Sequence, residues 1–263
     1  MKNELETLVA SGHNGLTRRL LLKASSSGAM LLGAGLLVGC GGSGDSHSHS
    51  SSGSKDTDIL GAAKIAEALA VTMYTNIINT SPFFATLADD DQSYIKNARD
   101  EEMFHYILLR SQTGGTDAPT TYYFPANMFT DPQTTLNVLV TLEDAFVAAY
   151  IYGVANFSSS ALRVIAAQIM GIESDHRSLA RVIAHELGLA STTGLSGSPE
   201  SVDPPNNNIY ERRYGLDTLD AIVNALKPFF DATTANANNF TVSKTFDPTY
   251  MPTGAGLFGN PPA

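Results

Sequence analysis

The chain has 263 residues, enough for one domain with appendages, and its formal net charge is −10. This acidic balance disfavours nucleic acid and anionic lipid as binding partners. Cys40 is the single cysteine, so the chain has no intramolecular disulfide, and the rest of it offers no thiolate to a metal.

Residues 1–39 predict an export signal. Arg18 and Arg19 precede a run of leucines, which resembles a twin-arginine signal. The apolar segment that follows, residues 28–39, is shorter than the roughly 20 residues that a permanent membrane helix needs. It ends in Leu-Val-Gly-Cys, which is similar to a bacterial lipobox, so we expect Cys40 to be lipidated and to become the mature N-terminus. A plain signal peptide with a chance cysteine is the alternative.

These features predict a lipoprotein of the periplasm or cell envelope, anchored to a membrane surface by lipid rather than threaded through it. Gly41 after the cysteine favours the outer membrane where the host has one. Removal of residues 1–39 takes away four basic and two acidic residues, which leaves 12 basic and 24 acidic residues and a formal charge of −12. The mature chain is therefore more acidic than the precursor.

Residues 40–57 are rich in glycine and serine and predict a flexible tether. His47 and His49 lie in it, and a solvated linker explains them better than a weak metal site does. Four helical patterns follow, at residues 58–80, 90–112, 132–156 and 159–187.

The connections between these helices indicate the topology. Asp131 and Pro132 form an N-cap and first-turn pair for the third helix, and Gly188 ends the fourth. Short loops join helices one to two and three to four, whereas about twenty residues without helical period join helices two and three. Two antiparallel hairpins with one long crossover are expected. Residues 191–263 predict a C-terminal extension with a short helix near 216–231 and an irregular tail that wraps the bundle.

Each of the four helices carries one glutamate in the middle of its apolar face: Glu67, Glu102, Glu143 and Glu173. The second and fourth helices add a histidine three residues later, His105 and His176. At this spacing the two side chains rise from the same helix face, one turn apart, and can meet one ion.

The two hairpins also repeat each other. A tyrosine follows the first glutamate of each hairpin by seven residues, at Tyr74 and Tyr150. The pattern Glu-x-x-His-x-x-Leu-x-Arg occurs in both hairpins and ends at Arg110 and Arg181. We interpret the chain as an internal repeat of one hairpin unit.

This pattern resembles the ferritin-like dinuclear carboxylate proteins, and among them exported bacterial ferritin-like-domain proteins, including those called desiccation-related. The resemblance covers residues 58–188. It implies an all-α, ferritin-like four-helix bundle over residues 58–190 that binds two divalent ions, iron or manganese. It also implies that Glu102 and Glu173 bridge the ions, that Glu67 and Glu143 are terminal ligands, and that each histidine holds one ion.

Electrostatics favours the same ligand set. Four ionised, unpaired carboxylates inside a bundle would be severely destabilising, and two divalent cations neutralise them. Carboxylate and imidazole without thiolate suit iron or manganese, and also accept zinc.

Several residues near these ligands stay open to more than one interpretation. Glu101 is a rival for Glu102, which we prefer because Ile172 stands at the equivalent position of the second hairpin. Glu101 and Asp175 are either outer acceptors for the histidines or solvated. Tyr74 and Tyr150, the candidate catalytic residues, either act near the metals or pack as core residues. His185 lies about 180° around its helix from His176 and is not expected to be a ligand.

The resemblance implies an oxidoreductase that reacts with dioxygen or peroxide, with peroxidase, catalase or oxidase chemistry, and it allows a homo-oligomer. A non-catalytic metal-binding or desiccation-protection protein is the alternative. Iron storage in a hollow shell is a weaker third option, because a lipid anchor, tether and C-terminal extension hinder closure of a cage.

Overall fold

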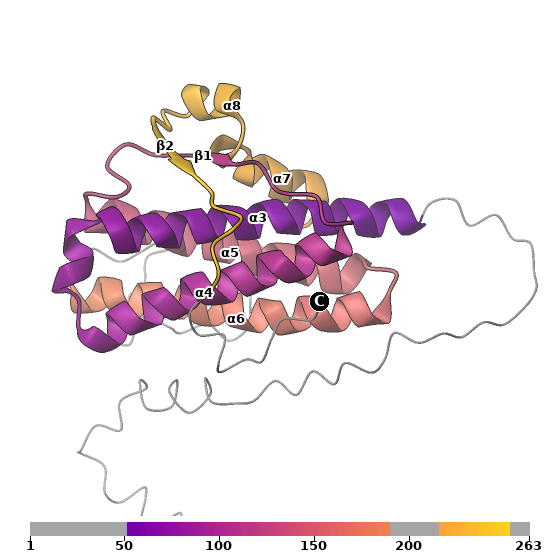
Figure 1. Ribbon diagram of the computed structural model, residues 1–263, viewed down its shortest axis with the longest axis horizontal. Helices are drawn as coiled ribbons and strands as arrows, with labels where there is room; N and C mark the ends of the chain where they lie inside the picture. The colour runs from indigo at the N-terminus through magenta and orange to yellow at the C-terminus, as the bar shows by residue number, and fades with distance from the viewer. Residues whose placement is uncertain (1–51, 190–215, 253–263) are drawn as a thin grey trace, which may run out of the picture. The chain divides into compact units, whose positions relative to one another are not determined.

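The computed structural model describes residues 52–189 and 216–252. Four long helices lie side by side and form a bundle (Figure 1): α3 (Ser52–Thr80), α4 (Asp89–Gln112), α5 (Pro132–Asn156) and α6 (Ser160–Glu186). A short 3-10 helix, η1 (Pro82–Thr86), lies in the connection between α3 and α4. The predicted all-α class is confirmed.

Two hairpins make up the bundle, because α3 packs mainly on α4 and α5 mainly on α6. The start of α3 lies beside the end of α5, since the Lys55 amino group donates to Asn156 Oδ1 at 2.9 Å and Asp56 accepts from the Ser158 amide at 2.9 Å. Antiparallel pairing places the end of α4 near that same end of the bundle. Residues 113–131 must therefore travel the length of the bundle to reach the start of α5, which is the single long crossover expected from the sequence.

The helix ends follow from local chemistry. The Asp131 carboxylate accepts from the Thr134 amide at 2.9 Å, and Pro132 begins α5 where a missing N–H costs nothing. The Ser159 hydroxyl caps α6 by accepting from the Leu162 amide at 3.4 Å. Gly188 follows α6 at φ +67°, a left-handed conformation that glycine adopts without a steric penalty.

Helix α3 begins at Ser52, earlier than the predicted start at residue 58, so the expected tether through residue 57 is wrong at its end. Lys55 and Asp56 hold the first turns of α3 through their hydrogen bonds to the end of α5 and the α5–α6 turn. The spacing of apolar residues in the sequence does not predict such contacts. The predicted signal segment 1–39, the lipidation site Cys40, and residues 41–51 lie outside the described residues.

The C-terminal region differs most from the sequence expectation. In place of one helix near 216–231, the chain forms α7 (Leu219–Leu226), a 3-10 turn η2 (Lys227–Phe229) and α8 (Ala232–Ala237). Pro228 explains the break, because proline lacks the N–H and clashes with the preceding turn of an α-helix. Residues 191–215 and 253–263 of the predicted extension are not among the described residues.

A two-stranded antiparallel sheet joins the crossover to the C-terminal region. Strand β1 (Thr121–Phe124) pairs with β2 (Val242–Thr245), with Thr121 opposite Thr245 and Phe124 opposite Val242. Tyr122 and Phe124 are fully buried, so this sheet fastens the crossover to the bundle. Neither segment has a helical period in its sequence, and irregular structure was expected for both.

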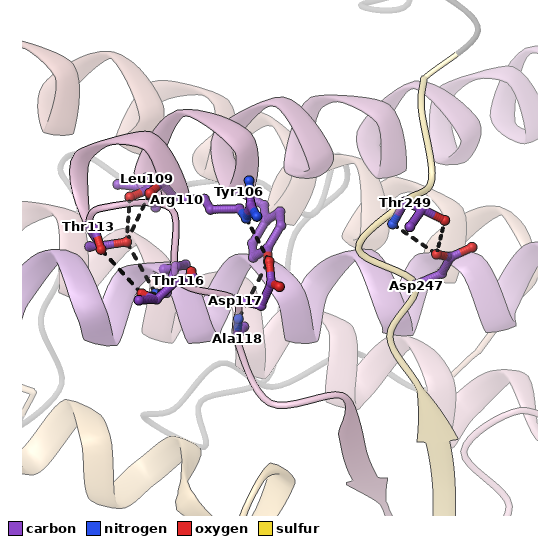
Figure 2. Close-up of polar contacts among 10 residues, drawn as sticks. Tyr106, Leu109, Arg110, Thr113, Thr116, Asp117, Ala118, Asp247 and Thr249 are labelled. Atoms are coloured by element: carbon purple, nitrogen blue, oxygen red, sulfur yellow. Dashed lines mark hydrogen bonds and ion pairs between the residues drawn. The ribbon is translucent and has the colours of Figure 1, made fainter. Parts of the chain in front are cut away.

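Polar contacts fasten the beginning of the crossover to α4 (Figure 2). Arg110 Nε pairs with Asp117 Oδ1 at 2.6 Å, and the Tyr106 hydroxyl donates to the same oxygen at 3.2 Å. Further along the chain, Asp247 accepts from the Thr249 amide at 2.9 Å and forms a turn just after β2. The first two bonds hold the crossover against α4 just before β1, and the third shapes the turn after β2.

Lys64 is a buried lysine of α3 that also holds this crossover. Its amino group donates to Thr116 O at 2.9 Å, Thr116 Oγ1 at 2.8 Å and Thr113 Oγ1 at 3.2 Å. Lys64→Met keeps the apolar stem and removes these bonds, so we expect a loss of about 1–3 kcal/mol in the free energy of unfolding. Urea denaturation measures it, with the exposed Lys96→Met as control. Equal stability of the two variants would contradict this role.

Helix α5 lies in the bundle and is strongly apolar. Among the described helices it alone is long and apolar enough to cross a membrane, with a mean hydropathy of 1.6 over its most apolar stretch. Within that stretch 61% is buried inside the protein. A core helix accounts for both values, and Glu143 is among its buried residues.

Candidate metal centre

The bundle buries one glutamate from each of its four helices at a common depth. Glu102, Glu143 and Glu173 are 0% exposed, and Glu67 is 2% exposed. They come from α4, α5, α6 and α3, respectively, and each belongs to the apolar face that its helix turns inward. Charged side chains are almost never buried to this degree without a partner, so this arrangement demands positive charge nearby.

These glutamates and the two histidines form two overlapping groups. The His105 half-site consists of Glu67, Glu102, His105 and Glu173, and the His176 half-site consists of Glu102, Glu143, Glu173 and His176. Within each group, one donor atom from every residue lies within 4.8 Å of the others. Glu102 and Glu173 belong to both half-sites, which is the position that the resemblance implies for bridging ligands.

Both histidines direct Nδ1 into the cluster. His105 Nδ1 lies 3.3 Å from Glu173, 3.4 Å from Glu102 and 3.5 Å from Glu67. His176 Nδ1 lies 2.8 Å from Glu102 and 3.5 Å from Glu173. The six residues predicted as ligands are thus brought together, and their metal binding stays a prediction.

The proton affinities of the cluster reflect its crowding. Burial raises the pKa of Glu67 well above its ordinary value, and the negative charges of Glu173 and Glu102 raise it further. Burial and the same two glutamates also raise the pKa of Glu143. Burial alone would lower the pKa of His105 and His176, but the surrounding carboxylates raise both well above the usual range. For Glu102 burial acts upward, yet the contacts with His176 and His105 hold its pKa well below normal.

The donor atoms fit a pair of divalent cations. Several buried atoms in the cluster have no hydrogen-bond partner among the described residues: Glu67 Oε2, Glu102 Oε2, Glu143 Oε2, Glu173 Oε1 and Oε2, and His105 Nδ1. Buried polar atoms are nearly always satisfied, so this concentration indicates a ligand. Four carboxylates with two imidazoles match the charge and ligand preference of two iron or manganese ions.

Each tyrosine of the repeat reaches across to the other hairpin. The Tyr74 hydroxyl donates to Glu143 Oε1 at 2.6 Å, and the Tyr150 hydroxyl donates to Glu67 Oε1. Burial and the nearby carboxylates raise the pKa of both tyrosines well above normal, so both remain proton donors. Both tyrosines are therefore in contact with the cluster. They hold Glu143 and Glu67, the two glutamates that belong to only one half-site each.

These hydroxyls are expected to contribute to the stability of the protein. Tyr74→Phe and Tyr150→Phe each remove the hydroxyl that satisfies a buried carboxyl oxygen, which costs about 1–3 kcal/mol. We expect that decrease in the unfolding free energy of the metal-free protein, measured by urea denaturation. The half-buried Tyr152→Phe is the control. Variants that match the control would show that the bonds to Glu143 and Glu67 contribute nothing.

The structure also places the residues that the sequence left open. Glu101 Oε2 lies 2.9 Å from His176 Nε2, on the side of the ring that faces away from the cluster. Asp175 is exposed, and so is His185, which belongs to neither half-site. Glu101 is therefore an outer partner of His176 and takes no part in either group.

A buried ion pair beside the cluster escaped the sequence analysis. Arg177 Nη1 donates to Asp144 Oδ1 at 2.7 Å, and both side chains are at most 5% exposed. Each follows a predicted ligand by one position, Glu143 and His176. The sequence could have indicated this pair only through opposite charges at facing positions of α5 and α6. Facing positions can be identified only when the register between the two helices is known.

A four-helix bundle with one long crossover and this glutamate–histidine set defines the class of ferritin-like proteins, whose inward-facing residues are compatible with a dinuclear metal site. Comparison of the sequence with family models agrees. The model of the ferritin-like domain matches residues 55–186, half of the chain, and the chain belongs to that family. None of the curated proteins compared with the chain matches it.

Proposed function

We propose that the protein is an exported, lipid-anchored metalloprotein whose dinuclear centre carries out redox chemistry with dioxygen or peroxide. One observation carries the dinuclear centre of this proposal: the two half-sites share Glu102 and Glu173, both fully buried. Shared carboxylates would hold two ions next to each other, and paired metal ions act together on small oxygen species or on one substrate.

The ligands would be the six residues of the two half-sites. Bound iron or manganese would supply a redox-active centre and Lewis acidity, which the side chains of this cluster lack, and the electrons for dioxygen reduction would come from a separate donor. Glu102 and Glu173 contribute to both positions, whereas Glu67 and His105 belong to one and Glu143 and His176 to the other.

The surrounding residues orient the ligands and exclude water. The hydroxyls of Tyr74 and Tyr150 keep their protons and orient Glu143 and Glu67 from the opposite hairpin. His105 has the most exposed side chain of the six, at 12%, whereas the other five are at most 2% exposed. Small molecules would reach the centre from that side, and the rest of the bundle shields it from bulk water.

Metal analysis and turnover test this function together. The purified protein should contain two iron or manganese ions and should consume hydrogen peroxide, or dioxygen when a chemical reductant is added. Glu102→Gln should lose both properties. Metal analysis would also choose between iron and manganese. A protein that holds two ions and consumes neither oxidant would rule out the redox function.

Metal binding without turnover is the second candidate, and near-complete burial of the glutamates favours it. A centre that small molecules reach only beside His105 can retain its ions and protect the cell by withholding them. Two ions that stay bound during dialysis, together with absent turnover, would establish this function.

The localisation rests on the residues at the N-terminus. Arg18→Lys with Arg19→Lys should leave the protein in the cytoplasm, and Cys40→Ser should move it from the membrane fraction to the soluble fraction of the envelope. Unimpaired export of the double arginine variant would contradict the twin-arginine route. Membrane retention of the Cys40→Ser variant would contradict the lipid anchor.

A further inference from the structure

The internal repeat is broken at one position beside the metal centre. In the first hairpin Glu101 precedes the shared glutamate Glu102, whereas in the second hairpin Ile172 precedes Glu173. One carboxylate therefore has no counterpart in the other half of the repeat. The structure gives this difference a location, because residues 101 and 172 lie on α4 and α6, the two helices that carry the histidines.

His176 is held at both of its ring nitrogens. Its Nδ1 faces Glu102 at 2.8 Å, inside the cluster, and its Nε2 meets Glu101 Oε2 at 2.9 Å, outside it. The bond between Glu101 and His176 joins α4 to α6. The His176 side chain is 1% exposed, so no free rotation is left to the ring, whereas the Glu101 side chain is 29% exposed and reaches solvent.

His105 lacks the equivalent support. Its Nδ1 faces Glu67, Glu102 and Glu173. Among the described residues no carboxylate pairs with its other ring nitrogen, and the repeat would draw that acceptor from α6, where Ile172 stands. The exposed fraction of its side chain is 12%, against 1% for His176.

We propose that the two half-sites bind metal with unequal affinity, and that Glu101 is the positioning residue that makes the His176 half-site the tighter one. The inference rests on the proposed metal binding of this same centre. A histidine that donates its outer N–H to a carboxylate is fixed in the tautomer and orientation that present the other nitrogen to the ion. Loss of such an outer partner weakens metal binding by about 10–100-fold.

The asymmetry sets an order of filling. The first ion enters the His176 half-site, whose imidazole is already oriented by Glu101. The second ion enters the His105 half-site, where binding must also fix the ring. That second ion is the one that exchanges with solution, because its histidine is the less buried of the two.

A titration of the metal-free protein with Co²⁺, followed by its visible absorption, tests this order. We expect two steps whose dissociation constants differ by about 10–100-fold. Glu101→Ala should weaken the first step by about that factor and leave the second unchanged. The exposed Glu186→Gln, on α6, is the matched control and should change neither step. Glu101→Gln should restore part of the affinity, because its amide oxygen still accepts the hydrogen bond.

Two further variants assign the steps. His105→Ala should retain the tight step alone, and His176→Ala should retain the weak step alone. Ile172→Glu should strengthen the weak step, since it places an acceptor for His105 at the equivalent position of the repeat. The side chain of Ile172 is partly exposed, so a glutamate there can reach solvent.

The outcomes separate this inference from the redox function. Two equal steps in the unmodified protein, or a Glu101→Ala variant that shifts both steps alike or neither, would overturn the inference even if the protein turns over oxidant. A protein with two unequal steps and no turnover would overturn the redox function and leave the inference intact. A protein that binds no Co²⁺ would overturn both.

Discussion

Glu102→Gln is expected to remove both metal ions from the protein. The substitution keeps the size of the side chain and removes a carboxylate that belongs to both half-sites, so neither ion retains a full ligand set. Affinity should fall by more than about 100-fold for each ion, because the loss of an outer partner alone costs up to that much. Glu173→Gln should behave in the same way. Metal content after gel filtration, determined by elemental analysis, measures the effect.

Matched variants show whether the loss follows the geometry. Glu143→Gln removes a carboxylate of the His176 half-site alone, so one ion should remain. Glu186→Gln, at an exposed position near the end of α6, should keep both ions. If Glu102→Gln still carries two ions, the shared position of Glu102 is wrong. If Glu143→Gln loses both ions, the division into two half-sites is wrong.

Removal of metal with a chelator is expected to lower the melting temperature substantially. Each ion would bind only the folded protein, because the ligands of each half-site come from three different helices. At a free ion concentration of about 1,000 times the dissociation constant, an ion adds about 4 kcal/mol of stability. For a domain of this size two ions then raise Tm by roughly 15–30 °C, at about 2–4 °C per kcal/mol. Calorimetry with and without added Mn²⁺ measures the difference.

The Glu102→Gln variant is the control for this melting experiment. It should melt at the same temperature with and without Mn²⁺, because its centre no longer retains the ions. An equal rise in that variant would mean that the stabilising ions bind elsewhere. A Tm that is indifferent to metal in the unmodified protein would show that the cluster does not couple ion binding to folding.

The bundle and the cluster could be predicted because their signals are local and repeated. The cap formed by Asp131 and Pro132 marked the start of α5, and Gly188 marked the end of α6. Glutamate and histidine three residues apart lie on one helix face whatever the rest of the chain does. The second hairpin repeats the first, so each prediction could be checked against its counterpart, and this check chose Glu102 over Glu101.

Features that depend on distant contacts could not be predicted in this way. Strand β1 pairs with β2 across more than a hundred residues, and neither four-residue segment shows a strand signal strong enough to stand alone. The early start of α3 depends on Asp56 meeting the α5–α6 turn. The bond from Glu101 to His176 joins two helices, so it required their register as well as their sequences.

The tyrosine–glutamate bonds show that neither hairpin contains a finished centre. Tyr74 of the first hairpin holds Glu143 of the second, Tyr150 of the second holds Glu67 of the first, and both half-sites draw ligands from each hairpin. The cluster is thus an interface between two copies of one unit, and a chain whose hairpins have come apart would lack the full ligand set of either half-site. Bound metal would add links between the two halves, so a protein cut within the crossover should resist separation of the halves more strongly with ions bound than without them.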